Sequence, residues 1–542
     1  MFAKSSAFLA LLAVLPVVSA APAVAAQSQE ERGLTELRNT VVNLLQALVE
    51  RGVMTREQAE GLVKNAQDKA ATEAAAVAAQ DAAESGAVRV PYIPEIVKDE
   101  IRKQVTADLA PQVAKEVVEQ SRQPGWANSF LPDWLSRVRL SGDVRLREEG
   151  DLFGTDNTEF GYLDFNSVNA KGGINKAGLD AFANTTQDRY RMRARGRIGL
   201  DAELGSGWTA GARITTGNLM DPVSTNQTLG NTGARYQTGF DLLYAGWAGS
   251  TSNQRHSLSL VGGRIANPWQ SHDLVWDPDL NFEGVAGTYR LGLTREAAAS
   301  HVLFLTLGAF PIQEVELSKD DKWLYGSQLG LDWHFDNGSR AHMGAAYYYY
   351  RNIVGKRNQL DSTLLDYTAP QFLQTGNTLF DIRNDKDNDT NLFALATNYH
   401  LLDGTIGFDF QLTPSYKISL NGEFVRNIGY DRALVLLNTG LDLKPRDSAY
   451  LAELAFGKTQ LAQAGDWRVA VGYRYLEADS MLDAFADSDF HLGGTNARGY
   501  TLSADFAFTE RVFARLRYLS ANEIDGNQVG IDVLQLDLNT RF

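Results

Sequence analysis

Residues 534–542 read Leu-Gln-Leu-Asp-Leu-Asn-Thr-Arg-Phe, and this stretch decides how the rest of the chain is interpreted. Apolar side chains alternate with polar ones along it. A period of two predicts a β-strand with one face in an apolar medium and the other in water. The same period runs from Ser136 to Phe542. We therefore expect a membrane all-β fold, in which strands rather than helices meet lipid.

The alternating segments number about sixteen, and short connections between them alternate with long ones. Short connections include 205–207 and 413–414, whereas 150–187 and 351–401 are long. This alternation is typical of a transmembrane meander, and it predicts an antiparallel β-barrel over residues 136–542 that encloses water. The uncertain segment is 390–400. The strands are expected near 136–149, 188–204, 207–218, 239–249, 255–265, 284–294, 299–310, 324–336, 339–350, 402–412, 415–428, 447–458, 465–478, 497–509, 511–521 and 530–542.

Composition excludes several other classes of protein. The chain has no Cys, which excludes disulfides, thiolate chemistry and a lipid-modified cysteine. Its formal net charge of −15 argues against nucleic acid as a partner. The seven His have no zinc-ligand spacing, and neither Gly-x-Ser-x-Gly nor a phosphate-binding Gly-rich motif occurs. We expect no catalytic residues and no cofactor.

The N-terminal quarter of the chain has a different pattern. Residues 1–26 predict a signal peptide, with Lys4, an apolar run too short to span a bilayer, and a small-residue cleavage site near Ala25 or Ala26. Apolar residues then recur at helical spacing over 27–123, and a linker follows over 124–135. Two arrangements of the helical segment stay open, a bundle under the barrel and a periplasmic coiled coil between subunits.

Strand parity predicts an Arg-lined lumen. In the second expected strand, five Arg occupy one face, and each would cost about 2–4 kcal/mol if it faced lipid near the midplane. The first strand repeats the pattern, and further Arg come from the third, thirteenth and fifteenth strands. The predicted pore-lining arginines are Arg137, Arg139, Arg145, Arg147, Arg189, Arg191, Arg193, Arg195, Arg197, Arg213, Arg468, Arg474, Arg515 and Arg517.

Acidic side chains are expected on the opposite side of the lumen, from Asp332, Asp409 and Glu423. Arg facing carboxylates across a narrow aperture would create a transverse field that filters solutes by charge. Arg also suits a bidentate grip on carboxylate or phosphate. The alternative is that these Arg neutralise luminal carboxylates or contact lipopolysaccharide phosphates. Asp385, Asp387 and Asp389 form a weak calcium-site candidate, because the Gly and Glu of a complete calcium loop are absent.

Three stretches resemble the putative porin family of Gram-negative bacteria. They are 133–148 (Asp-Trp-Leu-Ser-Arg-Val-Arg-Leu-Ser-Gly-Asp-Val-Arg-Leu-Arg-Glu), 263–269 (Gly-Arg-Ile-Ala-Asn-Pro-Trp) and 276–284 (Trp-Asp-Pro-Asp-Leu-Asn-Phe-Glu-Gly). The resemblance implies a passive diffusion channel of the outer membrane, trimeric in many related porins. The strand ending on Phe542 is similar to the terminal strands that the barrel-assembly machinery reads. The basic wall is similar to that of phosphate-selective porins in its chemistry only.

The sequence thus predicts an outer-membrane porin that passes small hydrophilic solutes, with a preference for anions. A plugged, energy-coupled receptor would need a globular plug and about 22 strands. A structural protein that tethers the outer membrane to peptidoglycan would make the helical segment the functional part.

Overall fold

The computed structural model describes residues 61, 64, 69, 135–294, 301–386 and 390–542. The chain divides into two compact units, Met1–Gln120 and Ser121–Phe542. The predicted signal peptide (1–26), the helical segment (27–123, three single residues apart) and the linker (124–135, Leu135 apart) lie outside the described residues. Among the helices of the described ranges, none has the length and apolar character needed to cross a membrane.

Sixteen antiparallel strands form a closed barrel, which confirms the predicted fold and strand number. A seventeenth, short strand, β4 (Gln227–Thr228), pairs with β2 at the rim. The uncertain segment 390–400 adds no further barrel strand, and its last residue, His400, begins β13. It contains β12 (Phe393–Leu395), which pairs with β11 (Leu379–Asp381) in a separate two-stranded sheet. The barrel strands are β1 (Val138–Phe153), β2 (Arg189–Gly205), β3 (Trp208–Thr216), β5 (Thr238–Ser250), β6 (His256–Ala266), β7 (Asn281–Gly292), β8 (His301–Gln313), β9 (Lys322–His334), β10 (Arg340–Arg351), β13 (His400–Gln411), β14 (Lys417–Asn427), β15 (Ser448–Gly457), β16 (Trp467–Leu476), β17 (Ala497–Ala507), β18 (Val512–Glu523) and β19 (Gly530–Arg541).

The barrel closes where β19 pairs with β1, from Asp143 opposite Arg541 to Phe153 opposite Ile531. Phe542 continues this ladder, because its backbone N–H and C=O each hydrogen-bond to Gly142 at 3.0 Å. A side chain at Gly142 would meet the Phe542 ring, since a Cβ built there lies 2.4 Å from its Cζ. The Gly therefore leaves room for the terminal aromatic ring.

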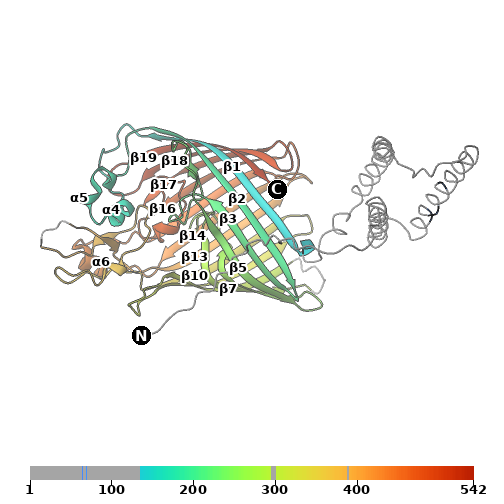
Figure 1. Ribbon diagram of the computed structural model, residues 1–542, viewed down its shortest axis with the longest axis horizontal. Coiled ribbons are helices and arrows are strands. Elements are labelled where there is room, and N and C mark those ends of the chain that lie inside the picture. Colours follow the sequence, from blue (N-terminus) through green and yellow to red (C-terminus); the bar gives the residue numbers. More distant parts are fainter. Residues whose placement is uncertain (1–60, 62–63, 65–68, 70–134, 295–300, 387–389) are drawn as a thin grey trace, which may run out of the picture. The chain divides into compact units, whose positions relative to one another are not determined.

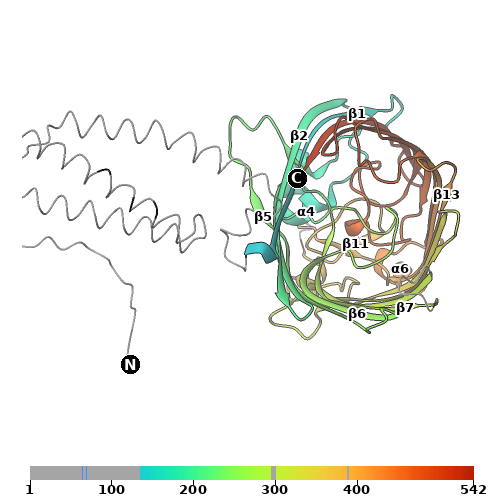
Figure 2. The same ribbon diagram turned by 90° about the vertical axis from the view of Figure 1, so that its right-hand side faces the viewer.

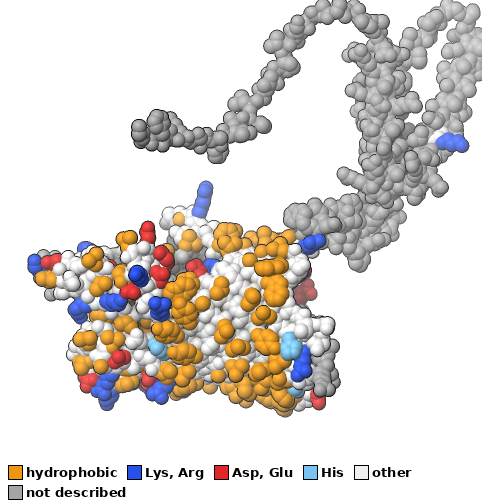
Figure 3. Space-filling view, turned by 90° about the horizontal axis from the view of Figure 1, so that it is seen from below, with side chains coloured by type: hydrophobic (Ala, Val, Ile, Leu, Met, Phe, Trp, Pro, Cys, Tyr) orange, Lys and Arg blue, Asp and Glu red, His pale blue; other side chains and the backbone are white. Residues whose placement is uncertain are grey.

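Alternation sorts the side chains of each strand between the two faces of the wall. In β1, Leu140, Val144 and Leu146 are exposed on the outer face, whereas Arg147 and Glu149 are buried on the inner face. Figure 3 shows apolar side chains over the flank of the barrel and charged ones toward its ends. Exposed aromatic rings lie near both ends of the strands, as in the aromatic girdles of membrane barrels. They include Trp208, Phe335, Phe410, Phe506 and Phe542 at one end and Tyr190, Phe240, Tyr347, Tyr450 and Tyr500 at the other.

Long loops gather at one end of the barrel and short turns at the end where the C-terminus lies (Figure 1). The connections at the end opposite the C-terminus are numbered L1 (154–188), L2 (217–237), L3 (267–280), L4 (314–321), L5 (352–399), L6 (428–447), L7 (477–496) and L8 (524–529), of which L4 and L8 are short. The helices lie in these loops: α4 (Phe165–Lys171), α5 (Ile174–Ala177) and the 3-10 helix η3 (Gly178–Ala181) in L1, η4 (Asp366–Thr368) in L5, α6 (Arg432–Thr439) in L6 and η5 (Asp483–Phe485) in L7. The 3-10 helix η2 (Leu135–Arg137) precedes β1.

The interior is only partly open, which corrects the expectation of a simply water-filled barrel. Loop chain occupies much of the ring when the barrel is viewed along its axis (Figure 2). Trp276 of L3 packs edge-on against Tyr348 of the wall, with ring centroids 5.1 Å apart, and Met481 and Phe485 of L7 join the same buried cluster. L5 is tied to L7, since the Asn377 amide donates to the carbonyls of Ala478 and Met481. Burial of these apolar side chains holds L3, L5 and L7 inside the barrel.

Candidate functional site

The register of β1 and β2 places like charges directly opposite each other on the inner face. Arg145 faces Arg195, and Arg147 faces Arg193. Directly opposed like charges destabilise a sheet unless anions lie between them. We call the inward arginines of these two strands the guanidinium ladder. They are Arg145 and Arg147 on β1 and Arg189, Arg191, Arg193, Arg195 and Arg197 on β2. The guanidinium ladder requires carboxylates close by.

The barrel wall supplies part of this compensation. Asp143 bonds Arg195 at 2.8 Å and Arg197 at 2.7 Å, from the neighbouring strand. Asp537 of β19 receives two N–H donors from Arg147, at 2.7 and 3.0 Å. Bidentate pairs of this kind fix the guanidinium plane as well as its position.

Glu149 is the wall carboxylate with the most partners. It accepts from Arg191, lies 3.3 Å from an Arg193 nitrogen, and takes a bond of 3.0 Å from the amide of Gln535. Arg191 also reaches Asp151 at 3.5 Å. The outer half of the ladder is therefore paired within the wall.

L3 brings a carboxylate to the middle of the ladder. Asp279 lies 3.1 Å from Arg195, 3.5 Å from Arg197 and 3.9 Å from Arg145. It also accepts hydrogen bonds from the hydroxyl of Thr225 at 2.9 Å and from the backbone N–H of Thr225 at 3.4 Å. Burial alone would raise the pKa of Asp279, but the arginines outweigh it and hold that pKa below its ordinary value. Asp279 is thus an anion fixed against three cations.

L7 brings a second carboxylate. Both oxygens of Asp489 lie 3.0 Å from Nη1 of Arg147, and one of them lies 2.9 Å from Nη1 of Arg517. Burial would raise the pKa of Asp489, but Arg147 and Arg517 outweigh it and hold that pKa well below its ordinary value. Asp277 joins the two loops, because its carboxylate accepts from the backbone N–H of Ser488 at 3.0 Å.

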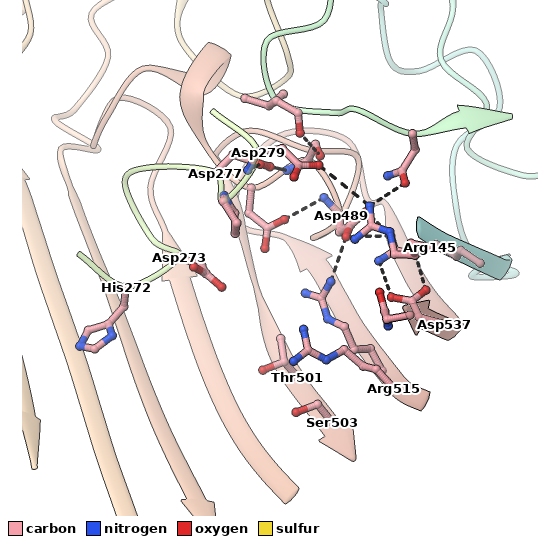
Figure 4. Close-up of a pocket in the computed structure, with 18 of the residues that line it drawn as sticks. Arg145, His272, Asp273, Asp277, Asp279, Asp489, Thr501, Ser503, Arg515 and Asp537 are labelled. Carbon is pink, nitrogen blue, oxygen red and sulfur yellow. Dashed lines mark hydrogen bonds and ion pairs between the residues drawn. The ribbon is translucent and has the colours of Figure 1, made fainter. Parts of the chain in front are cut away.

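Between these loops and the wall lies a chamber of about 510 Å³. Asp279 and Asp489 approach from the loops, while Arg515, Thr501 and Ser503 project from the strands (Figure 4). Eight arginines and seven carboxylic acids line it. We call this space the inner chamber.

The family of the chain follows from its sequence as a whole. The model of the putative porin family matches residues 38–542. The chain belongs to the putative porin family. Comparison with curated proteins finds no match. As a porin, it is an outer-membrane β-barrel channel of bacteria, as the sequence predicted.

Comparison with solved structures finds outer-membrane proteins at low sequence identity. OprB of Pseudomonas putida is 12% identical over 76% of this chain and 96% of that chain, with a TM-score of 0.41. OmpF of Salmonella typhi is 12% identical over 75% and 97%, with a TM-score of 0.39. The DcaP channel of Acinetobacter baumannii is 11% identical over 75% and 97%, with a TM-score of 0.37.

The porin brings many of the predicted arginines together, but not all. Arg145, Arg147, Arg195, Arg197, Arg468, Arg474, Arg515 and Arg517 line the inner chamber. Arg468 pairs with Glu453, Arg474 with Asp487 and Arg515 with Asp505.

The remaining six predicted arginines lie elsewhere. Arg191 and Arg193 pair with Glu149 and do not line the inner chamber. Arg137 is an exposed residue of η2, and Arg139 is exposed at the turn end of β1, 3.7 Å from Asp201. Arg189 is exposed at the loop end of β2. Arg213 makes a separate pair with Asp241 at 2.7 Å. Arg137, Arg139, Arg189 and Arg213 likewise do not line the inner chamber.

The expected division into an Arg wall and an acidic wall is wrong, because both sides of the barrel carry both charges. Asp332 pairs with Arg340 at 2.6 Å and Arg290 at 3.2 Å on the supposedly acidic side. Asp409 lies opposite Arg340 in the register and accepts from the hydroxyl of Ser419. Glu423 is buried under L3 and accepts from the backbone N–H of His272 at 2.8 Å.

The carboxylates that pair with the ladder were not among the residues predicted from the sequence. Asp143 and Glu149 share the parity of Arg145 and Arg147 on β1, so alternation could have placed them on the inner face. Asp279 lies within the stretch 276–284 that carried the family resemblance. Asp489 had no signal, since its position depends on how L7 folds.

The calcium candidate is not supported by the parts of the chain that the structure describes. Asp387 and Asp389 lie outside them, and Asp385 accepts a hydrogen bond from the hydroxyl of Thr390. In the described ranges, no group of three or more His, Cys, Asp or Glu is arranged to hold a metal ion.

Proposed function

We propose that this porin passes small hydrophilic solutes by passive diffusion and prefers anions. The observation that carries the proposal is the inner chamber, whose lining has eight arginines against seven carboxylic acids. Burial raises the pKa of two of those acids, Asp273 and Asp277, which reduces their share of negative charge. The lining is therefore net positive, and a positive lining of a narrow water-filled passage concentrates anions.

The preference should be moderate rather than absolute. Every arginine of the guanidinium ladder from Arg191 to Arg197 on β2 has a carboxylate partner within 3.5 Å. Pairing shortens the range of the field that each guanidinium creates. The passage therefore discriminates through a small excess charge and through the donors that each arginine still presents to a solute.

Single-channel recording of the refolded protein in a planar bilayer tests this proposal. Steady open-channel steps are expected, with a reversal potential under a salt gradient that indicates anion preference. Cation preference would contradict the role of the chamber. An absence of steps from a verified folded barrel would contradict the porin function and favour a structural role.

A plugged receptor fits this chain less well, because the barrel of this chain has sixteen strands, whereas a plugged receptor has about 22. We propose that residues 27–123 serve assembly instead, as a coiled coil within a homotrimer. Deleting 27–123 should then leave conduction intact and yield monomeric barrels in detergent. Trimers that survive the deletion would refute the assembly role, and loss of conduction would contradict a diffusion channel formed by the barrel alone.

Two further partners follow from the location in the outer membrane. We propose that the exposed flank contacts lipid and lipopolysaccharide, and that the barrel-assembly machinery recognises the strand ending in Phe542. Removing Phe542 should then lower the amount of barrel inserted in cells. An unchanged amount would count against recognition of that residue.

A further inference from the structure

A second chamber lies on the loop side of the first, and the two share a small part of their lining. This outer chamber has a volume of about 400 Å³ and lies among the loop ends of β1 and β2, L1 and L7. Arg189, Arg191 and Asp151 line it. Ser488 and Asp489 of L7 line both chambers.

The layer that separates the chambers is a dense ion-paired network. Arg147 and Asp537 are each 2% exposed, and Glu149 and Gln535 are each 1% exposed. Arg517 joins this layer through Asp489 and through the amide oxygen of Gln535 at 3.2 Å. Asp489 lies at this layer and lines the chamber on each side of it.

The geometry around Asp489 is that of a carboxylate-binding site. Nη1 of Arg147 lies 3.0 Å from both oxygens and Nη1 of Arg517 lies 2.9 Å from one of them, so two guanidinium nitrogens converge on a single carboxylate. Arginine side chains suit free carboxylates, because a guanidinium offers several N–H donors to the two oxygens. The wall contributes the cations, whereas the anion comes from a loop.

L7 does not depend on Asp489 for its position. The side chain of Asn377 binds two L7 carbonyls, and that of Gln374 binds the carbonyls of Asp483 and Ala486 at 2.7 and 2.8 Å. The Ser488 N–H is held separately by Asp277. The Asp489 side chain can therefore leave Arg147 and Arg517 while the loop stays in place.

We propose that Arg147 and Arg517 form a binding site for the carboxylate group of a permeating solute, and that Asp489 occupies this site until the solute displaces it. Asp489 is then a specificity-determining residue, since only a solute with a competing anionic group readily passes the ion-paired layer between the chambers. This inference rests on the proposed function and names the class of solute, a small organic carboxylate.

The test is inhibition of chloride current by sodium propionate, with the neutral isostere propionamide as the matched probe. Asp489→Asn removes the competing anion, so the half-inhibiting concentration of propionate should fall at least threefold relative to the unmodified protein. Chloride conductance should rise as well. Propionamide should inhibit neither protein.

Asp525→Asn is the matched control, because it removes the same charge from an exposed pair with Arg446 at the rim. Its half-inhibiting concentration should equal that of the unmodified protein. Equal values for Asp489→Asn and Asp525→Asn, or equal inhibition by propionamide, would overturn the inference while leaving the porin function intact. An unmodified protein that does not conduct would refute the porin function instead.

Asp489→Asn leaves two buried guanidinium groups with fewer anions, so a second variant guards against misfolding. Arg517→Lys keeps the positive charges of residues 147 and 517 but replaces the planar guanidinium of Arg517 with a single ammonium group. It should raise the half-inhibiting concentration of propionate at least threefold. An unchanged value would also overturn the inference.

Discussion

Replacing Asp279 by Asn tests whether the L3 carboxylate limits anion passage. The change removes one negative charge from the point where Arg145, Arg195 and Arg197 converge, and Asn preserves the size of the side chain. Asp143 remains as the partner of Arg195 and Arg197. The ladder therefore gains net positive charge at this point without losing all of its compensation.

The magnitude follows from the interaction of one unit charge with a passing ion. At about 6 Å in water this interaction is about 0.7 kcal/mol, and screening at 0.1 M salt reduces it to about 0.4 kcal/mol. Loss of the carboxylate should then raise the local anion concentration about twofold and lower that of cations about twofold. We expect the anion-to-cation permeability ratio to rise about three- to fourfold at 0.1 M salt, and only about 1.4-fold at 1 M salt.

Reversal potentials under a salt gradient, recorded at both ionic strengths, give these ratios. Asp442→Asn is the matched control, since Asp442 is 62% exposed in its pair with Arg432 on α6 and lies outside the inner chamber. A variant whose ratio equals that of the control at 0.1 M salt would refute the electrostatic role of Asp279. A shift of the same size at both ionic strengths would refute the mechanism, because it would not be screened.

Three further predictions concern the ladder, the closure of the barrel and the loop core. Changing Arg191, Arg193 and Arg195 to Ser should shift the reversal potential toward cations, and unchanged ion preference would remove these arginines from the selectivity mechanism. Gly142→Ala should lower the yield of folded barrel, measured by electrophoresis without heating. The reason is that the new Cβ would lie 2.4 Å from the ring of Phe542 and 2.8 Å from a backbone oxygen. Gly404→Ala is the control and should leave the yield unchanged, because the nearest atom to its Cβ would be 4.0 Å away. Burial raises the pKa of Asp483 in L7 from its ordinary value of 3.8 to about 7. Between these two pH values the folded protein binds more protons than the unfolded protein, so the stability of the folded protein falls as pH rises. Asp483→Asn should therefore match the unmodified protein near pH 4 and exceed it at pH 8, by up to roughly 4 kcal/mol in free energy of unfolding; a difference that does not change with pH would contradict this reasoning.

The sequence predicted the barrel well because the physical cause of a strand's two faces is local. Lipid and water lie on opposite sides of the wall, so every second residue reports its own environment. The five arginines of β2 could be placed on the inner face from their spacing alone. The predicted strand ends were also close to those observed, since the turns between strands are short and marked by Gly, Pro and Asn.

The loops were beyond this kind of prediction. Long loops with no period carry no sign of whether they extend outward or fold into the barrel. The interior core around Trp276 and Phe485 forms between segments about 200 residues apart in the chain, through packing that alternation does not encode.

The sequence by itself determined the membrane barrel, its strand number and the guanidinium ladder of β1 and β2. Only the tertiary structure decided what the ladder contacts. Arg147 meets Asp489 across 342 positions of sequence and Asp537 across 390, and the folding of L3 and L7 brings Asp279 and Asp489 to the wall. Spacing along a strand fixes which way a side chain points, whereas charge pairing between distant segments depends on closure of the barrel and on where the loops pack.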